Sequence, residues 1–236
     1  MNVIVEFTWT TKTPLRVHTG LARSGGVDRA VRERNDSPVL PGEAVKAAIR
    51  EAAERILRWQ GKYKMKEEEA RSIPMHPLLL RIFAPHSASS DGAMSSARYF
   101  FRSSIATKES IIDKMEVTST AINEETGTSK DNMLRSIEIW RPGIQFDLEI
   151  EGVNGDWSVG RLDHKDLCLL LMAIAATDAI GGGWGIGCGE LALSDLKYRV
   201  ELASGGSYTS VETSDLGSLQ RAIEAIESDV APEELA

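Results

Sequence analysis

A glycine-rich segment near the C-terminal end, residues 181–189, constrains the fold more than any other feature. It holds six glycines in nine residues, between an apolar stretch with helical spacing and a strand-like stretch. Glycine has no Cβ, so this loop can adopt positive φ repeatedly and lets a ligand approach its amides. The order helix, loop, strand excludes a dinucleotide fingerprint, and Glu190-Leu191 stands where a Walker-type loop needs Lys-Ser/Thr. Taken alone, the segment could be only a tight connection.

Hydrophobic periodicity predicts the elements around this loop. Their order is strand, helix, strand, strand, helix, strand, which is typical of a ferredoxin-like (βαββαβ) α+β fold. The second and third strands are separated by a long insertion, residues 107–135, and the third strand is expected to bend at Pro142-Gly143. We expect strands at residues 2–10, 97–106, 136–152 and 190–201, long helices at 43–59 and 165–180, and a short helix or turn at 76–83.

The chain has no internal repeat, so we expect a single domain over residues 1–204. Residues 87–96 are rich in Ser and Gly and are predicted to be a loop. Residues 205–236 are expected to add a loop, a short helix at 218–228 and an acidic tail that frays.

Cysteine usage and hydropathy restrict the class of protein. Cys168 and Cys188 form no C-x-x-C pair and no signal peptide is present, which favours a protein of the reducing cytoplasm. The longest apolar run, residues 167–180, is interrupted by Asp178 and is too short to span a bilayer. No membrane association is therefore expected.

Charge is distributed unevenly along the chain. The net charge is −8, which argues against nucleic-acid binding if charge is taken as a whole. Residues 1–64, however, hold 12 Lys and Arg against 7 Asp and Glu, a local excess of +5. One basic face on an acidic protein is compatible with this asymmetry.

Two N-terminal segments give the glycine-rich loop a context. Residues 19–28 end in Gly25-Gly26-Val27-Asp28, and a basic loop leads from them to residues 40–50, which read LPGEAVKAAIR. Residues 122–129, INEETGTS, and the loop at 181–189 follow in that order.

These four segments resemble motifs of the RAMP (repeat-associated mysterious protein) superfamily over about residues 3–200. The resemblance is closest to the backbone subunits of type III CRISPR effector complexes. Their motifs are a G-G-[IV]-D loop, an I-P-G-S-S-L-K-G-x-x-R helix start, an I-D-x-x-T-G-x-[AS] stretch and a Gly-rich loop before the last strand. This chain departs from them at Glu43, Ala47 and Asn123, and has Trp184 and Ile186 where Arg or Ser is frequent.

The resemblance implies an RRM-type palm with an inserted thumb hairpin at about residues 107–135 and a short C-terminal helix. It also implies a protein that binds a CRISPR guide RNA and a single-stranded target RNA, and that cuts the target. Copies of the protein would form a filament along the guide, together with other CRISPR effector subunits.

Asp28 is the candidate catalytic residue. Two glycines precede it and arginines surround it in the sequence, so its carboxylate should stay ionised and could hold a divalent cation, Mg²⁺ or Mn²⁺. The resembling subunits need the Asp at this place to cut RNA. From the residues alone, a loop Asp that caps a turn or pairs with an arginine is as good an interpretation.

The candidate RNA-binding residues lie in three places. Lys46 and Arg50 are one turn apart near the start of their helix, where the helix dipole favours phosphate, although such a pair is often only a solvated face. Trp184 could stack on a base or cover the core. The full predicted set is His18, Arg23, Ser24, Lys46, Arg50, Gly182, Gly183, Trp184, Gly185 and Gly187.

The insertion matches the family's thumb, which wedges between bases of the guide–target duplex. Ile122, Met133 and Leu134 are the candidate wedges. An ordinary hairpin without this role is the alternative.

Three other functions stay open. The first is an RNA-binding scaffold subunit without nuclease activity, and the presence of Asp28 argues against it. The second is a guide-processing endoribonuclease, which usually has two domains and a catalytic His. The third is a ferredoxin-like module that binds a small anion, which would leave the basic N-terminal loop and the insertion without a role.

Overall fold

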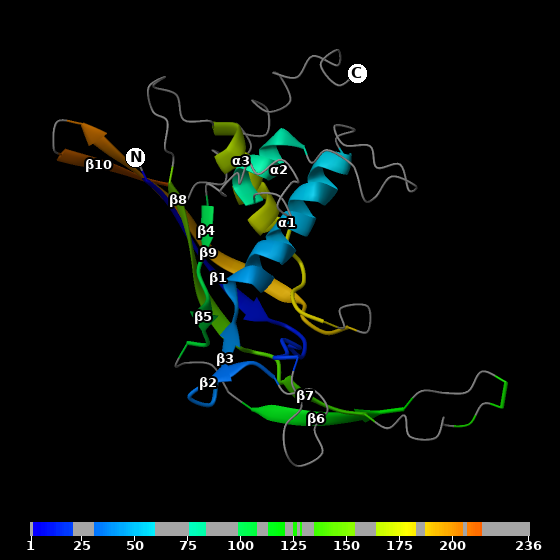
Figure 1. Ribbon diagram of the computed structural model, residues 1–236. Helices are drawn as coiled ribbons and strands as arrows, with labels where there is room; N and C mark the ends of the chain where they lie inside the picture. The colour runs from blue at the N-terminus through cyan, green and yellow to red at the C-terminus, as the bar shows by residue number, and fades with distance from the viewer. Residues whose placement is uncertain are drawn as a thin grey trace, which may run out of the picture.

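The computed structural model describes residues 2–20, 31–59, 76–83, 99–107, 113–120, 125–126, 128, 135–153, 164–182, 187–204 and 207–213. A five-stranded antiparallel sheet carries helices on one face, and two small antiparallel sheets lie at one end of it (Figure 1). The predicted α+β class is confirmed.

The order of strands in the main sheet is β10-β9-β1-β8-β4. In β1, the residues at positions 3, 5, 7 and 9 are buried under the helices, and the residues between them are more exposed. Phe7 and Trp9 pack edge to face, with ring centroids 5.1 Å apart. The strands are β1 (Asn2–Thr11), β4 (Tyr99–Phe101), β8 (Gln145–Val153), β9 (Leu191–Ser204) and β10 (Ser207–Thr213).

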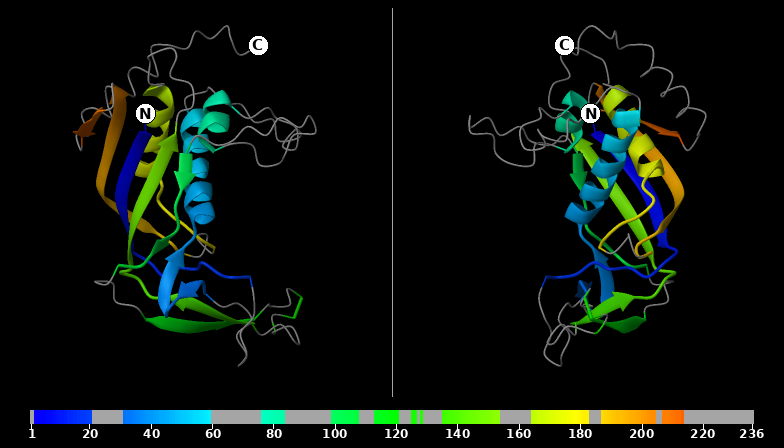
Figure 2. Two further views of the ribbon diagram at one scale, coloured as in Figure 1. Left: turned by 60° about the vertical axis from the view of Figure 1, so that its left-hand side comes forward. Right: turned by 90° about the vertical axis from the view of Figure 1, so that its right-hand side faces the viewer.

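Three helices, α1 (Gly42–Trp59), α2 (Pro77–Phe83) and α3 (His164–Ala175), cover one face of this sheet, as both views in Figure 2 show. Val45, Ile49 and Ala52 recur at helical spacing on α1 and are buried. Helix α1 begins in close contact with β4. Only glycine fits at its first position, because a Cβ at Gly42 would collide with the carbonyl oxygen of Phe101.

A buried ion pair joins α2 to α3. Asp166 is 3% exposed and accepts two hydrogen bonds from Arg81 Nε and one, of 2.7 Å, from Arg81 Nη2. A bidentate arginine pair of this kind fixes both partners in direction.

Arg81→Ala is expected to lower the free energy of unfolding by about 2–3 kcal/mol, because it leaves the Asp166 carboxylate buried without its cation. About a third of the Arg81 side chain is exposed, which holds the loss to the lower end of the range for buried pairs. Urea unfolding measures it, with Arg55→Ala as the control, because Arg55 pairs with Asp178 at the surface. Equal losses in both variants would contradict the role of the buried pair.

The two small sheets lie below the main sheet in Figures 1 and 2. One consists of β2 (Glu33–Arg34), β3 (Ser37–Leu40) and β5 (Ser104–Ile105). The other is an antiparallel pair, β6 (Lys114–Ser119) and β7 (Arg135–Trp140). The turn between β2 and β3 uses Asn35 and Asp36 at φ of 51° and 59°, the pattern of a two-residue hairpin turn.

Most predicted elements are present, with four corrections. The predicted strand at 97–106 is two strands, β4 and β5, and the predicted strand at 136–152 is β7 and β8. Helix α3 ends at Ala175 instead of residue 180. The predicted loop at the start of 205–236 is wrong over 207–213, where β10 pairs with β9. The predicted loop at 87–96 and helix at 218–228 lie outside the described residues.

Candidate functional site

Residues 12–20, here called the connector, join several distant parts of the chain. One edge of the connector bonds the glycine-rich segment: Gly182 N donates to Arg16 O and Gly189 N to Pro14 O, each over 2.8 Å. The other edge bonds β7, where Leu15 and Trp140 exchange two backbone hydrogen bonds. Leu15 and Val17 are buried, so Arg16 and His18 share the opposite face.

The connector also closes the ends of the segment that carries Asp28. His18 and Val31 form a β-bridge, and Arg32 N donates to Val17 O over 2.7 Å. Residue Glu138 of β7 contacts both ends: its carboxylate accepts from Val31 N at 3.2 Å and its carbonyl from His18 Nε2 at 3.1 Å. Arg23, Ser24 and Asp28 themselves lie outside the described residues.

One amide of the glycine-rich segment that was predicted to bind a ligand is hydrogen-bonded to the connector instead. The amide of Gly182 is bonded to Arg16, as described above, so it does not offer its hydrogen to a ligand. Gly187 differs, because it is exposed and no atom lies within 4 Å of the position that a Cβ would take. Its φ is +83°. Gly183, Trp184 and Gly185 lie outside the described residues.

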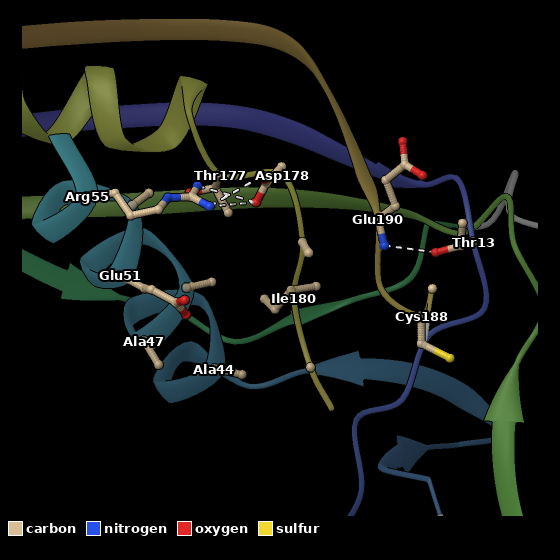
Figure 3. Close-up of a pocket in the computed structure, with 15 residues that line it drawn as sticks. Thr13, Ala44, Ala47, Glu51, Arg55, Thr177, Asp178, Ile180, Cys188 and Glu190 are labelled. Carbon is tan, nitrogen blue, oxygen red and sulfur yellow. Dashed lines mark hydrogen bonds and ion pairs between the residues drawn. The ribbon is translucent and has the colours of Figure 1, made fainter. Parts of the chain in front are cut away.

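A groove of about 660 Å³ separates this segment from α1 (Figure 3). Alanines of α1 form its wall, and Arg55 crosses it toward Asp178, with Nη2 at 3.3 Å from the carboxylate. Among the described residues that line the groove are three carboxylates, those of Glu51, Asp178 and Glu190, and one arginine. An acidic lining does not suit RNA phosphates.

The predicted basic residues lie on the other flank of α1. Residues two positions apart on a helix point in nearly opposite directions. Lys46 stands two positions from Ala44 and Ala48, and Arg50 two positions from Ala48 and Ala52, all of which line the groove. Lys46 and Arg50 therefore share a flank that faces away from Gly187, and the predicted RNA-binding residues divide between two surfaces.

Lys46 and Arg50 differ in availability. The Arg50 side chain is only 11% exposed, and its Nε donates to Glu54 over 3.0 Å. Partial burial, and then the neighbouring charge of Arg50, lower the pKa of Lys46 below its ordinary value. The ammonium group of Lys46 is thus partly dehydrated and repelled by Arg50, and a bound phosphate would offset both unfavourable terms.

Sequence reasoning missed two residues of this region, Arg16 and Glu138. The Nε atom of Arg16 is buried and has no hydrogen-bond partner among the described residues. The alternation of apolar and basic residues in Leu15-Arg16-Val17-His18 was the available signal for Arg16. Nothing in the sequence pattern marks Glu138, because its partners are far away in the chain.

The antiparallel pair β6–β7 frames the predicted insertion. Lys114 of β6 forms an ion pair with Glu33 and lies over the Trp140 ring, 5.0 Å from its centroid. Arg141 Nε lies 2.6 Å from an Asp113 carboxylate oxygen across the base of the pair. The wedge candidates Ile122, Met133 and Leu134 lie outside the described residues.

The open face of the main sheet carries both acidic and basic side chains, because Lys197 of β9 stands opposite Glu6 and Arg199 opposite Ile4. Glu6 of β1 stands directly opposite Glu149 of β8, and Thr8 donates to Asp147 over 2.8 Å. Arg102 bonds Glu149 and Glu151 at the edge of this face.

Two further types of site are absent from the described part of the chain. No group of three or more His, Cys, Asp or Glu side chains there could hold a metal ion. None of the helices there is long and apolar enough to cross a membrane.

The sequence matches the family model of the RAMP superfamily over residues 8–192, which is most of the chain. The protein belongs to the RAMP superfamily. Its mixed α+β architecture with antiparallel sheets agrees with the ferredoxin-like folds of that superfamily. RAMP proteins bind CRISPR RNA and work in CRISPR complexes. No curated protein matches the sequence.

Proposed function

We propose that this RAMP protein is the repeating backbone subunit of a type III CRISPR effector complex and that it cuts the target RNA paired with the guide. The observation that carries the proposal is the convergence at the connector: the ends of the Asp28 segment, the glycine-rich segment and the β6–β7 pair all bond residues 12–20 or their direct neighbours.

In this proposal the palm consists of β1, α1, β4, β8, α3 and β9 in chain order. These strands lie in the order β9-β1-β8-β4, with each neighbouring pair antiparallel, which is how a ferredoxin-like βαββαβ unit is arranged. The hairpin β6–β7 is the base of the thumb. Copies would repeat head to tail along the guide in the cytoplasm, because a heterologous contact propagates instead of closing.

The guide's phosphates would lie against the connector and the Lys46 flank of α1. The carboxylates that line the groove at Arg55 disfavour phosphate there, whereas Arg16, His18 and Lys46 supply basic groups on the connector and on this flank of α1. The protein would read the RNA backbone there, while base pairing supplies sequence specificity.

Cleavage would use the RNA's own 2′-hydroxyl as nucleophile. Its oxygen gives up its proton and attacks the adjacent phosphorus, the bond from phosphorus to the 5′-oxygen of the next nucleotide breaks, that oxygen takes up a proton from water, and a 2′,3′-cyclic phosphate remains. Asp28 would position the hydroxyl or hold a divalent cation that neutralises charge on the phosphate. A chelator should then stop cleavage and leave guide binding intact.

Lys46→Ala tests the RNA-binding part of the proposal. We expect the complex, purified with its genomic partners, to carry less short guide RNA. The affinity for unrelated RNA sequences should fall uniformly, with a salt dependence flatter by about one unit for each lost phosphate contact. Arg50→Ala should weaken binding less, since Glu54 already holds this guanidinium. RNA binding that is unchanged in Lys46→Ala would remove this helix from the interface.

The pH dependence of RNA affinity is a second test of Lys46, with Lys46→Arg as its matched control. Because the pKa of Lys46 is lowered, this side chain loses its charge at a lower pH than an ordinary lysine, and RNA affinity should begin to fall earlier as pH rises. Lys46→Arg stays charged over this range and should remove that early fall.

A further inference from the structure

Glu138 connects the thumb base to both ends of the Asp28 segment. It lies in the middle of β7, where its Cα pairs with that of Glu116 in β6. Its carboxylate Oε2 accepts from Val31 N at 3.2 Å, and its backbone carbonyl accepts from His18 Nε2 at 3.1 Å. Glu138 therefore bonds both His18, which precedes segment 19–30, and Val31, which follows it.

The contact is embedded in others that make it rigid. His18 and Val31 are bridged to one another, and Val17 O accepts from Arg32 N over 2.7 Å. On the hairpin side, Leu15 and Trp140 exchange two backbone hydrogen bonds, and Lys114 pairs with Glu33. A displacement of β7 would thus be transmitted to Val31, and Asp28 precedes Val31 by three residues.

We propose that Glu138 is a positioning residue for target cleavage: its carboxylate holds the Val31 amide and so fixes the described end of the segment that carries Asp28 relative to β7. This inference rests on the proposed function, because it assumes that Asp28 cuts RNA. It adds a link between β7, at the base of the proposed thumb, and the end of the segment that carries the proposed catalytic residue.

The test compares three variants that differ in one group. Glu138→Ala removes the acceptor of the Val31 hydrogen bond. Glu138→Gln keeps an oxygen acceptor and removes the charge. Glu116→Ala removes a carboxylate from the exposed position directly across the hairpin, which has no hydrogen bond or ion pair to the connector among the described residues.

Two readouts are measured on the assembled complex. Single-turnover cleavage of a labelled target should be at least about tenfold slower in Glu138→Ala, because a small displacement of a catalytic group has effects of this size, while the affinities for guide and target stay unchanged. Hydrogen exchange at the Val31 amide should be about tenfold faster or more in Glu138→Ala, from the loss of a bond to a charged acceptor. Glu138→Gln should retain most of both properties, and Glu116→Ala should behave as wild type.

The outcomes separate the inference from the proposed function. A wild-type cleavage rate in Glu138→Ala, together with faster exchange at Val31, overturns the positioning role. Unchanged exchange at Val31 overturns the hydrogen bond itself. If the wild-type complex shows no cleavage that depends on Asp28, the proposed function fails, and the inference fails with it.

Discussion

Asp28→Ala is expected to abolish cleavage of target RNA in the assembled complex and to leave guide and target binding within a few-fold. The carboxylate follows a Gly-Gly pair, and arginines flank it in the sequence. The described ends of its segment are fixed by the His18–Val31 bridge and by Glu138.

The measurement is a labelled-target assay with Mg²⁺ or Mn²⁺ for wild type, Asp28→Ala and Asp28→Asn. The products should carry a 2′,3′-cyclic phosphate, and a 2′-deoxy nucleotide at the cut should block scission, because it lacks the nucleophile. Asp36→Ala serves as a control for the loss of a nearby carboxylate outside the segment. Full cleavage by Asp28→Ala would move the protein to the class of RNA-binding scaffolds without nuclease activity.

The sequence predicted the α+β class and most element positions, because hydrophobic periodicity reports which residues are buried. The strand at 2–10 and the helix at 43–59 agree with β1 and α1 to within about one residue. Periodicity does not report which sheet a strand joins. The apolar run that was predicted as one strand is divided at Gly143, whose φ is 93° and whose amide bonds Thr11 O, so β7 and β8 enter different sheets.

Other differences have the same origin in long-range contacts. Helix α3 ends early because Ala179 and Ile180 pair with residues 189–190 instead of continuing the helix. Arg50 has the sequence position of a phosphate ligand, yet it is buried against Glu54. The bond from Val31 to Glu138 joins residues 107 positions apart, which no local pattern can indicate.

Gly189→Ala is expected to destabilise the protein by about 4 kcal/mol or more, through a strained φ and a backbone collision. Gly189 has φ of +82°, and a Cβ there would collide with the carbonyl oxygen of Ile180. The two residues are bonded, since Ile180 N donates to Gly189 O over 2.9 Å, so neither can move away without breaking the closure of the glycine-rich segment. Gly189 N also donates to Pro14 O, and the collision should therefore displace the connector as well.

Gly187→Ala is the matched control. Gly187 has nearly the same φ, +83°, but no atom lies within 4 Å of the position that its Cβ would take. Its substitution should cost only the conformational strain, about 1–2 kcal/mol. Urea unfolding of the two variants gives the difference, which isolates the close approach of Gly189 to Ile180. Equal losses in Gly187→Ala and Gly189→Ala would show that the strained φ alone accounts for both, and that the close approach of Gly189 to Ile180 contributes nothing measurable.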